Sequence, residues 1–537
     1  MKVLGFRQAN AWLHTWAGLL LGWLLYAVFL TGTLSFFQEE ITFWMKPELH
    51  ASVPNPQSTE RLVAKVQMLA PNAAQWTLTL PGDRNAAAQA QWFDIGQPIV
   101  KRGGHSIALD AGSAEPVTPR QTRGGSFLYR FHFELYGMPR VLARWIIGIA
   151  TMVMLVAIVS GVITHKKIFK EFFTFRPRKG QRSWLDAHNA TAVLALPFHL
   201  MITYSGLLLL MFMLMPWAVT SAYRADTQAF FNESGGRGAR GAPAPAAGEP
   251  NTHMPHSPLT DLAPLLAHAE QRWPRGVASI SVSRPGQPNA VIELRERGGD
   301  SLIDRGSSER LRFDGVNGAL LSSPPTPAIS TTNALYNVFS SLHLIRFAGA
   351  PLRWLFFISG VIGTAMIVTG LVLWVVKRLP ERHKRGSTPM GHRVVEVLNV
   401  GTVAGLLVAT AAYFWANRLL PVGITQRSDW EIRSFFIVWL VCLIHPLLRT
   451  HKRAWLEQLV IAAGLFAALP LFSISLEHSH LLSSLKQGQW LLAGVDLTLL
   501  TSAALLAFTA WKLSRYQPQP RLQRQPRHTG VSQESAA

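Results

Sequence analysis

The stretch Ser183–Met215, SWLDAHNATAVLALPFHLMITYSGLLLLMFMLM, decides the architecture of this chain. About 20 helical residues cross the roughly 30 Å hydrocarbon core of a bilayer, so the stretch is long enough to span a membrane. It carries His188 near its N-terminal end and His199 well inside the apolar run. On one continuous helix, the spacing predicts both imidazoles on one face, roughly 16 Å apart. Ionisable residues at membrane depth are costly, so two such histidines indicate ligands to a cofactor in a helix bundle.

Hydropathy along the 537 residues predicts a mainly α-helical integral membrane protein with about eight transmembrane helices. The apolar segments cover about 12–36, 142–164, 190–216, 352–376, 394–416, 432–449, 454–476 and 489–512. Two long polar stretches, about 40–140 and 218–345, interrupt them. The first apolar run exceeds the hydrophobic region of a signal peptide, and no clear A-x-A site follows it. We therefore expect a retained membrane anchor.

Positive charge predicts the orientation. The loops after the second and fourth apolar segments are HKKIFKEFFTFRPRKGQRSW and KRLPERHKRGSTPMGHR, and the C-terminal tail is also basic. The loops on the other side, around 417–431 and 477–488, carry fewer cations. By the positive-inside rule, both termini and the basic loops are expected in the cytoplasm and both polar stretches outside it. The net charge of +21 follows mostly from these loops, so we expect anionic lipid and not nucleic acid as its partner.

The single cysteine, Cys442, lies in the sixth apolar segment. One cysteine excludes disulfides within the polar stretches, c-type haem attachment and cysteine-ligated iron–sulfur clusters. No G-x-G-x-x-G motif follows a predicted strand, so we expect no internal NADPH or flavin site. A metal centre would therefore have to use histidine, carboxylate or backbone ligands.

The first four apolar segments form an internal repeat. His14 precedes Gly32 by eighteen residues, and His188 precedes Gly206 by the same interval. The second and fourth segments also match each other. The aligned residues are His132 with His343, Arg144-Trp145 with Arg353-Trp354, and Gly161 with Gly370. We infer a duplicated unit of helix, outer domain and helix, an architecture known among membrane proteins.

The polar stretches repeat as well. The first contains a predicted helix, STERLVAKVQMLA, and alternating strands that end in a turn at Asp110. The second contains a helix, LTDLAPLLAHAEQRW, and strands that end in a turn at Asp314. The low-complexity run GGRGARGAPAPAAGEP before this second copy is typical of a flexible linker. Both stretches are therefore predicted to be α+β domains.

The predicted organisation assigns every part of the chain. It comprises a first transmembrane helix (1–38), a periplasmic domain (39–141), helices two and three with a basic cytoplasmic loop (142–216), a second periplasmic domain with its linker (217–345), a fourth helix (346–378), four additional helices (379–513) and a basic cytoplasmic tail (514–537).

These motifs resemble the PepSY-associated transmembrane proteins, often called iron-regulated membrane proteins. The matching pieces are WLHTWAGL around His14, the Asp110 turn, the block from Gly161 to ALPFHLMITYSG, and LHLIRFAG with GVIGTAMIVTGLVLW. The resemblance covers about residues 1–380. It is specific for a subfamily that resembles inner-membrane ferric-siderophore reductases, which bind haem b between transmembrane helices and reduce iron on the outer side. One departure is that His165 stands where the repeat partner has Trp374.

The resemblance implies two PepSY-like periplasmic domains and an oxidoreductase of the bacterial inner membrane that contains one or two haem b groups. Its substrate would be a ferric siderophore delivered by an outer-membrane uptake system, and its electron donor a quinol or a cytoplasmic reductase. Two rivals stay open. One is a transporter of iron, haem or ferric chelate, and the other is a non-enzymatic PepSY membrane regulator.

Six histidines are candidate ligands to haem iron or contacts to the cofactor: His14, His188, His132, His343, His199 and His165. His14 and His188 could instead cap helices or meet lipid headgroups. His132 and His343 could be interfacial histidines beside an aromatic belt. His199, without a repeat partner, could pair with His132 or His343 or bind alone. His165, beside two lysines, could be an exposed loop residue.

Most of the remaining histidines are expected to be solvated, although His253 and His256, which flank Met254, could touch metal. These histidines lie in polar segments: His50, His105, His253, His256, His268, His383 and His392. Glu39 and Glu40 end the first apolar segment, where we favour solvation of the helix end over contact with iron.

Overall fold

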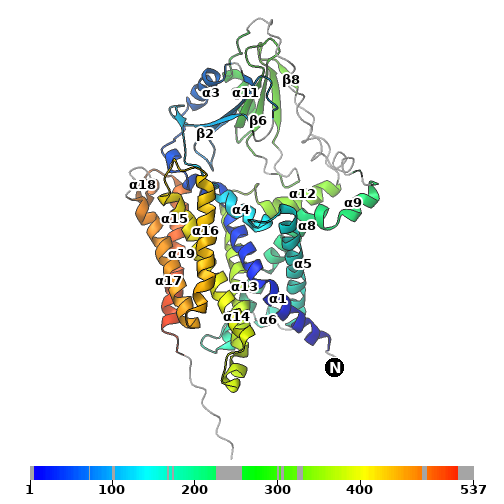
Figure 1. Cartoon of the computed structure of the whole chain (residues 1–537). Helices are drawn as coiled ribbons and strands as arrows, with labels where there is room; N and C mark the ends of the chain where they lie inside the picture. The colour runs from blue at the N-terminus through cyan, green and yellow to red at the C-terminus, as the bar shows by residue number, and fades with distance from the viewer. Residues whose placement is uncertain are drawn as a thin grey trace, which may run out of the picture.

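The structure is a computed structural model, and it describes residues 5–71, 73–99, 103–165, 168–171, 174–224, 226, 257–298, 301–303, 308–322, 331–474 and 480–517. The predicted linker, His253, His256, His478 and the chain beyond 517 lie outside these residues. A bundle of long helices forms one part of the molecule, and a β-sheet with two helices stands beyond one end of the bundle (Figure 1).

Eight helices in the described residues are long and apolar enough to cross a membrane, which confirms the predicted number. They are α1 (Phe6–Ser35), α5 (Arg140–Thr164), α8 (Leu196–Leu214), α13 (Ala350–Arg385), the segment Met390–Leu419, the segment Arg427–Leu447, α17 (His451–Ser473) and α19 (Trp490–Ser514). The segment Met390–Leu419 consists of α14 (Met390–Asn399), a π-helical turn η2 (Val400–Ala404) and α15 (Gly405–Leu419). The segment Arg427–Leu447 consists of α16 (Arg427–Ile444) and the short η3 (His445–Leu447).

The third apolar segment is not one continuous helix, so that expectation was wrong. It divides at Ala195 into α7 (Gln181–Leu194) and α8. Pro197 explains the break, because proline has no N–H to donate and its ring clashes with the carbonyl four residues earlier. His188 therefore lies on α7 and His199 on α8, and the single-helix estimate of their separation does not apply.

Short elements connect the long helices. They are α2 (Gln38–Trp44), η1 (Pro47–Leu49), α4 (Gly125–Glu134), α6 (Ile168–Glu171), α9 (Pro216–Ala222), α12 (Thr331–Leu344) and α18 (Leu481–Lys486).

The two polar stretches do not form separate sheets. Their strands are β1 (Ala73–Thr79), β2 (Ala88–Asp94), β3 (His105–Leu109), β4 (Pro116–Val117), β5 (Val277–Ser283), β6 (Val291–Glu296), β7 (Arg310–Asp314) and β8 (Leu320–Ser322). They make one antiparallel sheet in the order β4-β3-β2-β1-β5-β6-β7-β8. The first strands of the two copies, β1 and β5, pair at its centre, with Leu78 opposite Ile280. The predicted outer domains are thus halves of one eight-stranded body.

Strand alternation divides the sheet into two faces. Trp76, Leu78, Ile280 and Val282 are fully buried in one core with residues of α3 (Ser58–Leu69) and α11 (Ala263–Arg272). The alternate positions carry hydroxyl and amide side chains, and Thr77 Oγ1 lies 2.9 Å from Ser281 Oγ across the central strand pair. This period-two pattern is typical of a sheet with one covered face and one polar face.

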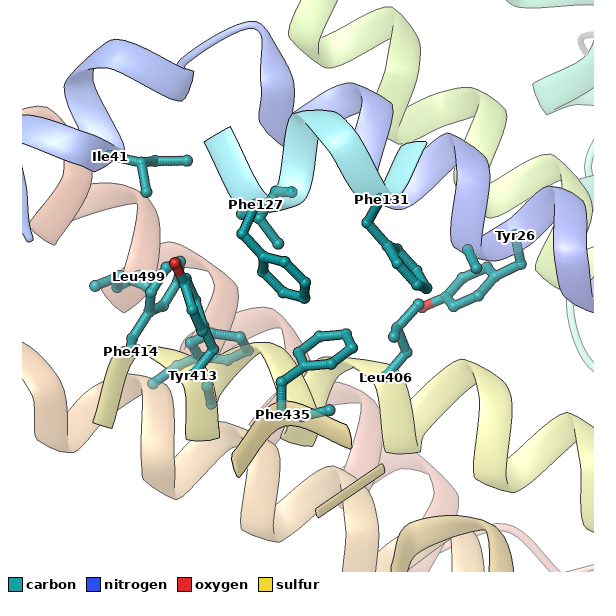
Figure 2. Close-up of a cluster of buried hydrophobic side chains, with 14 of the residues drawn as sticks. Tyr26, Ile41, Phe127, Phe131, Leu406, Tyr413, Phe414, Phe435 and Leu499 are labelled. Carbon is teal, nitrogen blue, oxygen red and sulfur yellow. The ribbon is translucent and has the colours of Figure 1, made fainter. Parts of the chain in front are cut away.

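The last four membrane helices pack against the duplicated part through an aromatic cluster. Figure 2 shows Phe127 and Phe131 of α4 pointing toward Tyr413 and Phe435 of the added helices. The ring centre of Phe127 lies 5.0 Å from that of Tyr413 and 5.1 Å from that of Phe435. These distances match favourable aromatic pairing, so the added helices belong to the same packed core.

Candidate functional site

Two pairs of histidines face one another between the helices of the duplicated part. His14 of α1 and His188 of α7 have ring centres 6.1 Å apart, with an angle of 64° between the ring planes. His132 of α4 and His343 of α12 also have ring centres 6.1 Å apart, at 37°. We call His14 and His188 the loop-side pair, and His132 and His343, which come from the short helices at the sheet end of the bundle, the sheet-side pair. The two pairs consist of repeat equivalents, as a pseudo-twofold axis requires.

In the loop-side pair, each imidazole contacts the second long helix of its own half of the repeat. His14 of α1 contacts α5, and His188 of α7 contacts α13. His14 Nδ1 lies 2.8 Å from the carbonyl oxygen of Ala157, and His188 Nδ1 lies 2.9 Å from that of Met366. Each carbonyl stands one helical turn before a repeat-equivalent glycine, Gly161 in α5 or Gly370 in α13. The two halves of the repeat therefore make the same histidine-to-carbonyl contact.

The sheet-side pair follows the same pattern. His132 Nδ1 lies 2.7 Å from the carbonyl oxygen of Val28, one turn before Gly32 in α1. His343 Nδ1 lies 3.0 Å from Ser205 Oγ and also bonds to the backbone of Ile202, one turn before Gly206 in α8. Since the four glycines stand at matching positions in the repeat, the histidine-to-glycine spacing seen in the sequence has a structural reason.

The glycines make room for the imidazole rings. A Cβ atom at Gly32 would lie 2.6 Å from His132 Nδ1, and one at Gly161 would lie 3.0 Å from His14 Cε1. The corresponding distances at Gly370 and Gly206 are 3.1 Å to His188 Cε1 and 3.2 Å to His343 Cε1. Any side chain at these positions would push the ring away from the carbonyl that orients it.

The geometry of both pairs fits axial ligation of haem iron. A backbone acceptor at Nδ1 selects the tautomer whose Nε2 lone pair is available to a metal. Two imidazole nitrogens, each about 2 Å from a shared metal, place the ring centres about 6 Å apart, and both pairs show 6.1 Å. Within the described residues, no group of three or more His, Cys, Asp or Glu side chains could hold a metal ion. Each pair thus offers two ligands, and a porphyrin would supply the remaining four.

A cavity of about 430 Å³ opens beside the sheet-side pair. Its lining includes His132, His343, Arg144, Arg346 and Tyr129, among mostly apolar side chains from α1, α5 and α8. This volume lies in the range of small-molecule and cofactor sites, which are typically apolar with a few placed polar groups. Arg346 would suit a carboxylate of a haem, since guanidinium groups bind carboxylates well, whereas Arg144 already pairs with Glu134.

His199 belongs to neither pair. It is 1% exposed, and neither of its ring nitrogens has a hydrogen-bond partner. Its ring packs between Phe29 and Phe198, at 6.3 Å and 6.0 Å, and a Cβ at Gly363 would lie 2.9 Å from its Cε1. His132 and His343 face each other, and His199 lies outside that pair, so its predicted role as a ligand stays a prediction.

His165 also lies outside both pairs. It ends α5, where its backbone N–H donates to the carbonyl of Gly161, the glycine that packs against His14. It lies near enough to His188 to interact with it electrostatically. Its predicted role as a ligand stays a prediction.

Three residues predicted to be solvated are buried. His50 is 3% exposed and its Nε2 lies 2.9 Å from the carbonyl oxygen of Phe43. Glu40 is 5% exposed and forms ion pairs of 2.7 Å with both Arg84 and Arg353. His392, in α14, is also 5% exposed. All three come from polar stretches of sequence, and only tertiary packing covers them.

Comparison with known proteins agrees with this fold. Residues 11–377 match the family described as the PepSY-associated TM region. This match covers more than half of the chain, and the protein belongs to that family. An uncharacterised protein of Pseudomonas aeruginosa is 26% identical over 420 residues, which cover 75% of this chain and 98% of that relative.

Proposed function

We propose that the protein is a haem-b-containing ferric reductase of a bacterial inner membrane, with both termini in the cytoplasm and the sheet in the periplasm. Electrons would cross the membrane and reduce Fe(III) in a siderophore on the periplasmic side. The observation that supports this proposal best is the pair of matched imidazole contacts, one near each end of the bundle. Two metal-binding histidine pairs at different heights in one bundle suit the transfer of electrons along the bundle. The binding of a single small molecule would not need both pairs.

The chain's own residues would hold and tune the cofactor. When bound, haem b supplies a one-electron couple whose potential depends on its axial ligands and surroundings. The carbonyls of Ala157, Met366 and Val28 orient the imidazoles, and the apolar helices exclude water from them. Arg346 places positive charge at the cavity beside the sheet-side pair, where Arg144 is paired with Glu134.

Reduction would serve the release of iron. Hard oxygen donors of a siderophore hold Fe(III) far more tightly than Fe(II), so one electron weakens the chelate. The polar face of the sheet offers the hydroxyl groups of Thr77 and Ser281, which can hydrogen-bond to a polar chelate. The helices that carry the sheet-side pair, α4 and α12, lie at the end of the bundle from which the sheet extends (Figure 1). The site nearest the chelate would therefore be this pair.

An optical spectrum of the purified protein tests the proposal. We expect a haem-b Soret band that shifts on reduction with dithionite and returns when an anaerobic ferric hydroxamate is added. A colourless protein that carries iron or haem into vesicles would support the rival transporter. A colourless protein that carries neither would support a membrane regulator.

A further inference from the structure

A second group of buried polar residues lies where α13 meets α14. His392 and Glu396 are one turn apart on α14 and are 5% and 2% exposed. The Glu396 carboxylate accepts a hydrogen bond of 2.8 Å from Arg382 of α13, and it lies 3.4 Å from His392 Nε2. The ring centre of Trp374, also on α13, lies 6.0 Å from that of His392. We call His392, Glu396 and Trp374 the α14 cluster.

The cluster has unused hydrogen-bonding capacity. His392 Nε2 and Trp374 Nε1 are buried atoms without a hydrogen-bond partner, and a Glu396 carboxylate oxygen lies 3.4 Å from His392 Nε2. A buried polar atom left unpaired costs about 1–3 kcal/mol. Such groups in a membrane-spanning segment are by default a hypothesis for a functional site. The α14 cluster can therefore form hydrogen bonds with polar atoms of a bound molecule.

The position of the cluster connects it to the loop-side pair. Trp374 stands one helical turn after Gly370, against which the His188 ring packs. His392 and His188 therefore both lie against α13, at Trp374 and at Gly370, one turn apart. On the opposite face of α14, Met390 and Val394 are 85% and 47% exposed and would face lipid. The cluster lies one helix away from the lipid phase.

We propose that the α14 cluster is the site at which a membrane hydroquinone delivers electrons. This inference rests on the proposed function and names the donor. A hydroquinone has one hydroxyl group that can donate to His392 Nε2 and oxygen atoms that can accept from Trp374 Nε1. The Arg378 guanidinium covers a face of the Trp374 ring at 3.8 Å, so the indole contributes its N–H. Glu396, held by Arg382, would stabilise the imidazolium formed when His392 accepts the proton.

The reaction balances against the two ferric ions that the proposed function reduces. Oxidation of one hydroquinone to a quinone releases two electrons and two protons, with cleavage of its two O–H bonds. His392 accepts the protons in turn and passes each to water on the side of the basic loops. The two electrons leave one at a time toward the loop-side pair, so one hydroquinone would reduce two ferric ions.

The experiment uses the purified, haem-loaded full chain in detergent under anaerobic conditions, with duroquinol as the hydroquinone. Haem reduction is followed optically in the wild type, His392→Phe, Glu396→Gln and the control His383→Ala. His383 lies next to Arg382 in the basic last turn of α13, and its side chain is exposed. General-base catalysis contributes about 10²–10⁴-fold. We therefore expect a loss of roughly a hundredfold in His392→Phe, a smaller loss in Glu396→Gln and wild-type rates in His383→Ala.

Dithionite separates the two proposals. A protein that contains no dithionite-reducible haem contradicts the proposed function itself. Haem that dithionite reduces but duroquinol does not overturns the hydroquinone site alone. Wild-type rates with duroquinol in both His392→Phe and Glu396→Gln would overturn it equally. If His392→Phe does not fold, Glu396→Gln and the wild-type protein decide the question.

Discussion

His188 Nδ1 lies 2.9 Å from the carbonyl oxygen of Met366, with the imidazole ring packed against the backbone one turn further along the same helix. The same relationship joins His14 to Ala157 in the other half of the repeat. Because the backbone sets the tautomer, Nε2 of each ring is left for a metal. The predictions below follow from this arrangement and from the buried charges around it.

Removal of one loop-side histidine should remove one haem. In His14→Ala or His188→Ala, we expect about half of the wild-type haem per polypeptide if each pair holds one group, because the sheet-side pair is untouched. The pyridine haemochrome assay measures this content. His383→Ala, which changes an exposed histidine, should retain all of it. Full haem content in both loop-side variants would exclude these residues as ligands.

Gly32 should be intolerant of even a methyl group. In Gly32→Ala, the new Cβ would lie 2.6 Å from His132 Nδ1, so the ring or α1 must shift. We expect loss of the sheet-side haem and a lower midpoint of thermal unfolding in detergent. Gly18→Ala is the matched control in the same helix, because nothing lies within 4 Å of that position. The control should be neutral or stabilise α1 by about 0.5–1 kcal/mol.

The Glu40 carboxylate should be essential to stability. It is 5% exposed and pairs with Arg84, from the turn between β1 and β2, and with Arg353 of α13. Breaking a buried pair leaves uncompensated charge and costs roughly 3–5 kcal/mol, so Glu40→Gln should strongly lower the unfolding midpoint. Glu381→Gln removes the partner of Arg385 in an exposed pair and should change stability by less than about 1 kcal/mol. Equal effects of the two substitutions would contradict the assigned burial.

His50 should make stability depend on pH. Burial lowers the pKa of His50 to about 4 from its ordinary value of 6.5. The folded state therefore favours the neutral ring, and the stability this contributes is present above pH 6.5 and is lost as the pH falls toward 4. The loss amounts to roughly 3 kcal/mol. Unfolding midpoints between pH 7 and pH 4 should show it.

His50→Gln provides the comparison for this titration, because glutamine can still donate to the carbonyl of Phe43 and does not titrate. The part of the pH dependence between 6.5 and 4 should shrink in this variant. An unchanged profile would show that other groups carry it.

The membrane-spanning segments and the repeated residues could be predicted from the order of residues alone. Runs of apolar residues set the eight helices, and the recurring interval from histidine to glycine marked His14, His188, Gly32 and Gly206 as related positions. Both are local properties: hydrophobic length sets a span, and residue count sets the height along a helix.

The pairing of the imidazoles could not be predicted in this way, because it depends on how separate helices cross in the folded protein. The tertiary structure paired His132 with His343 and left His199 between aromatic rings, while Pro197 broke the helix on which the expected geometry relied. It also joined β1 to β5 and buried His392 in a polar-looking segment. Such contacts link residues distant in the chain, and no pattern within one segment specifies its partner.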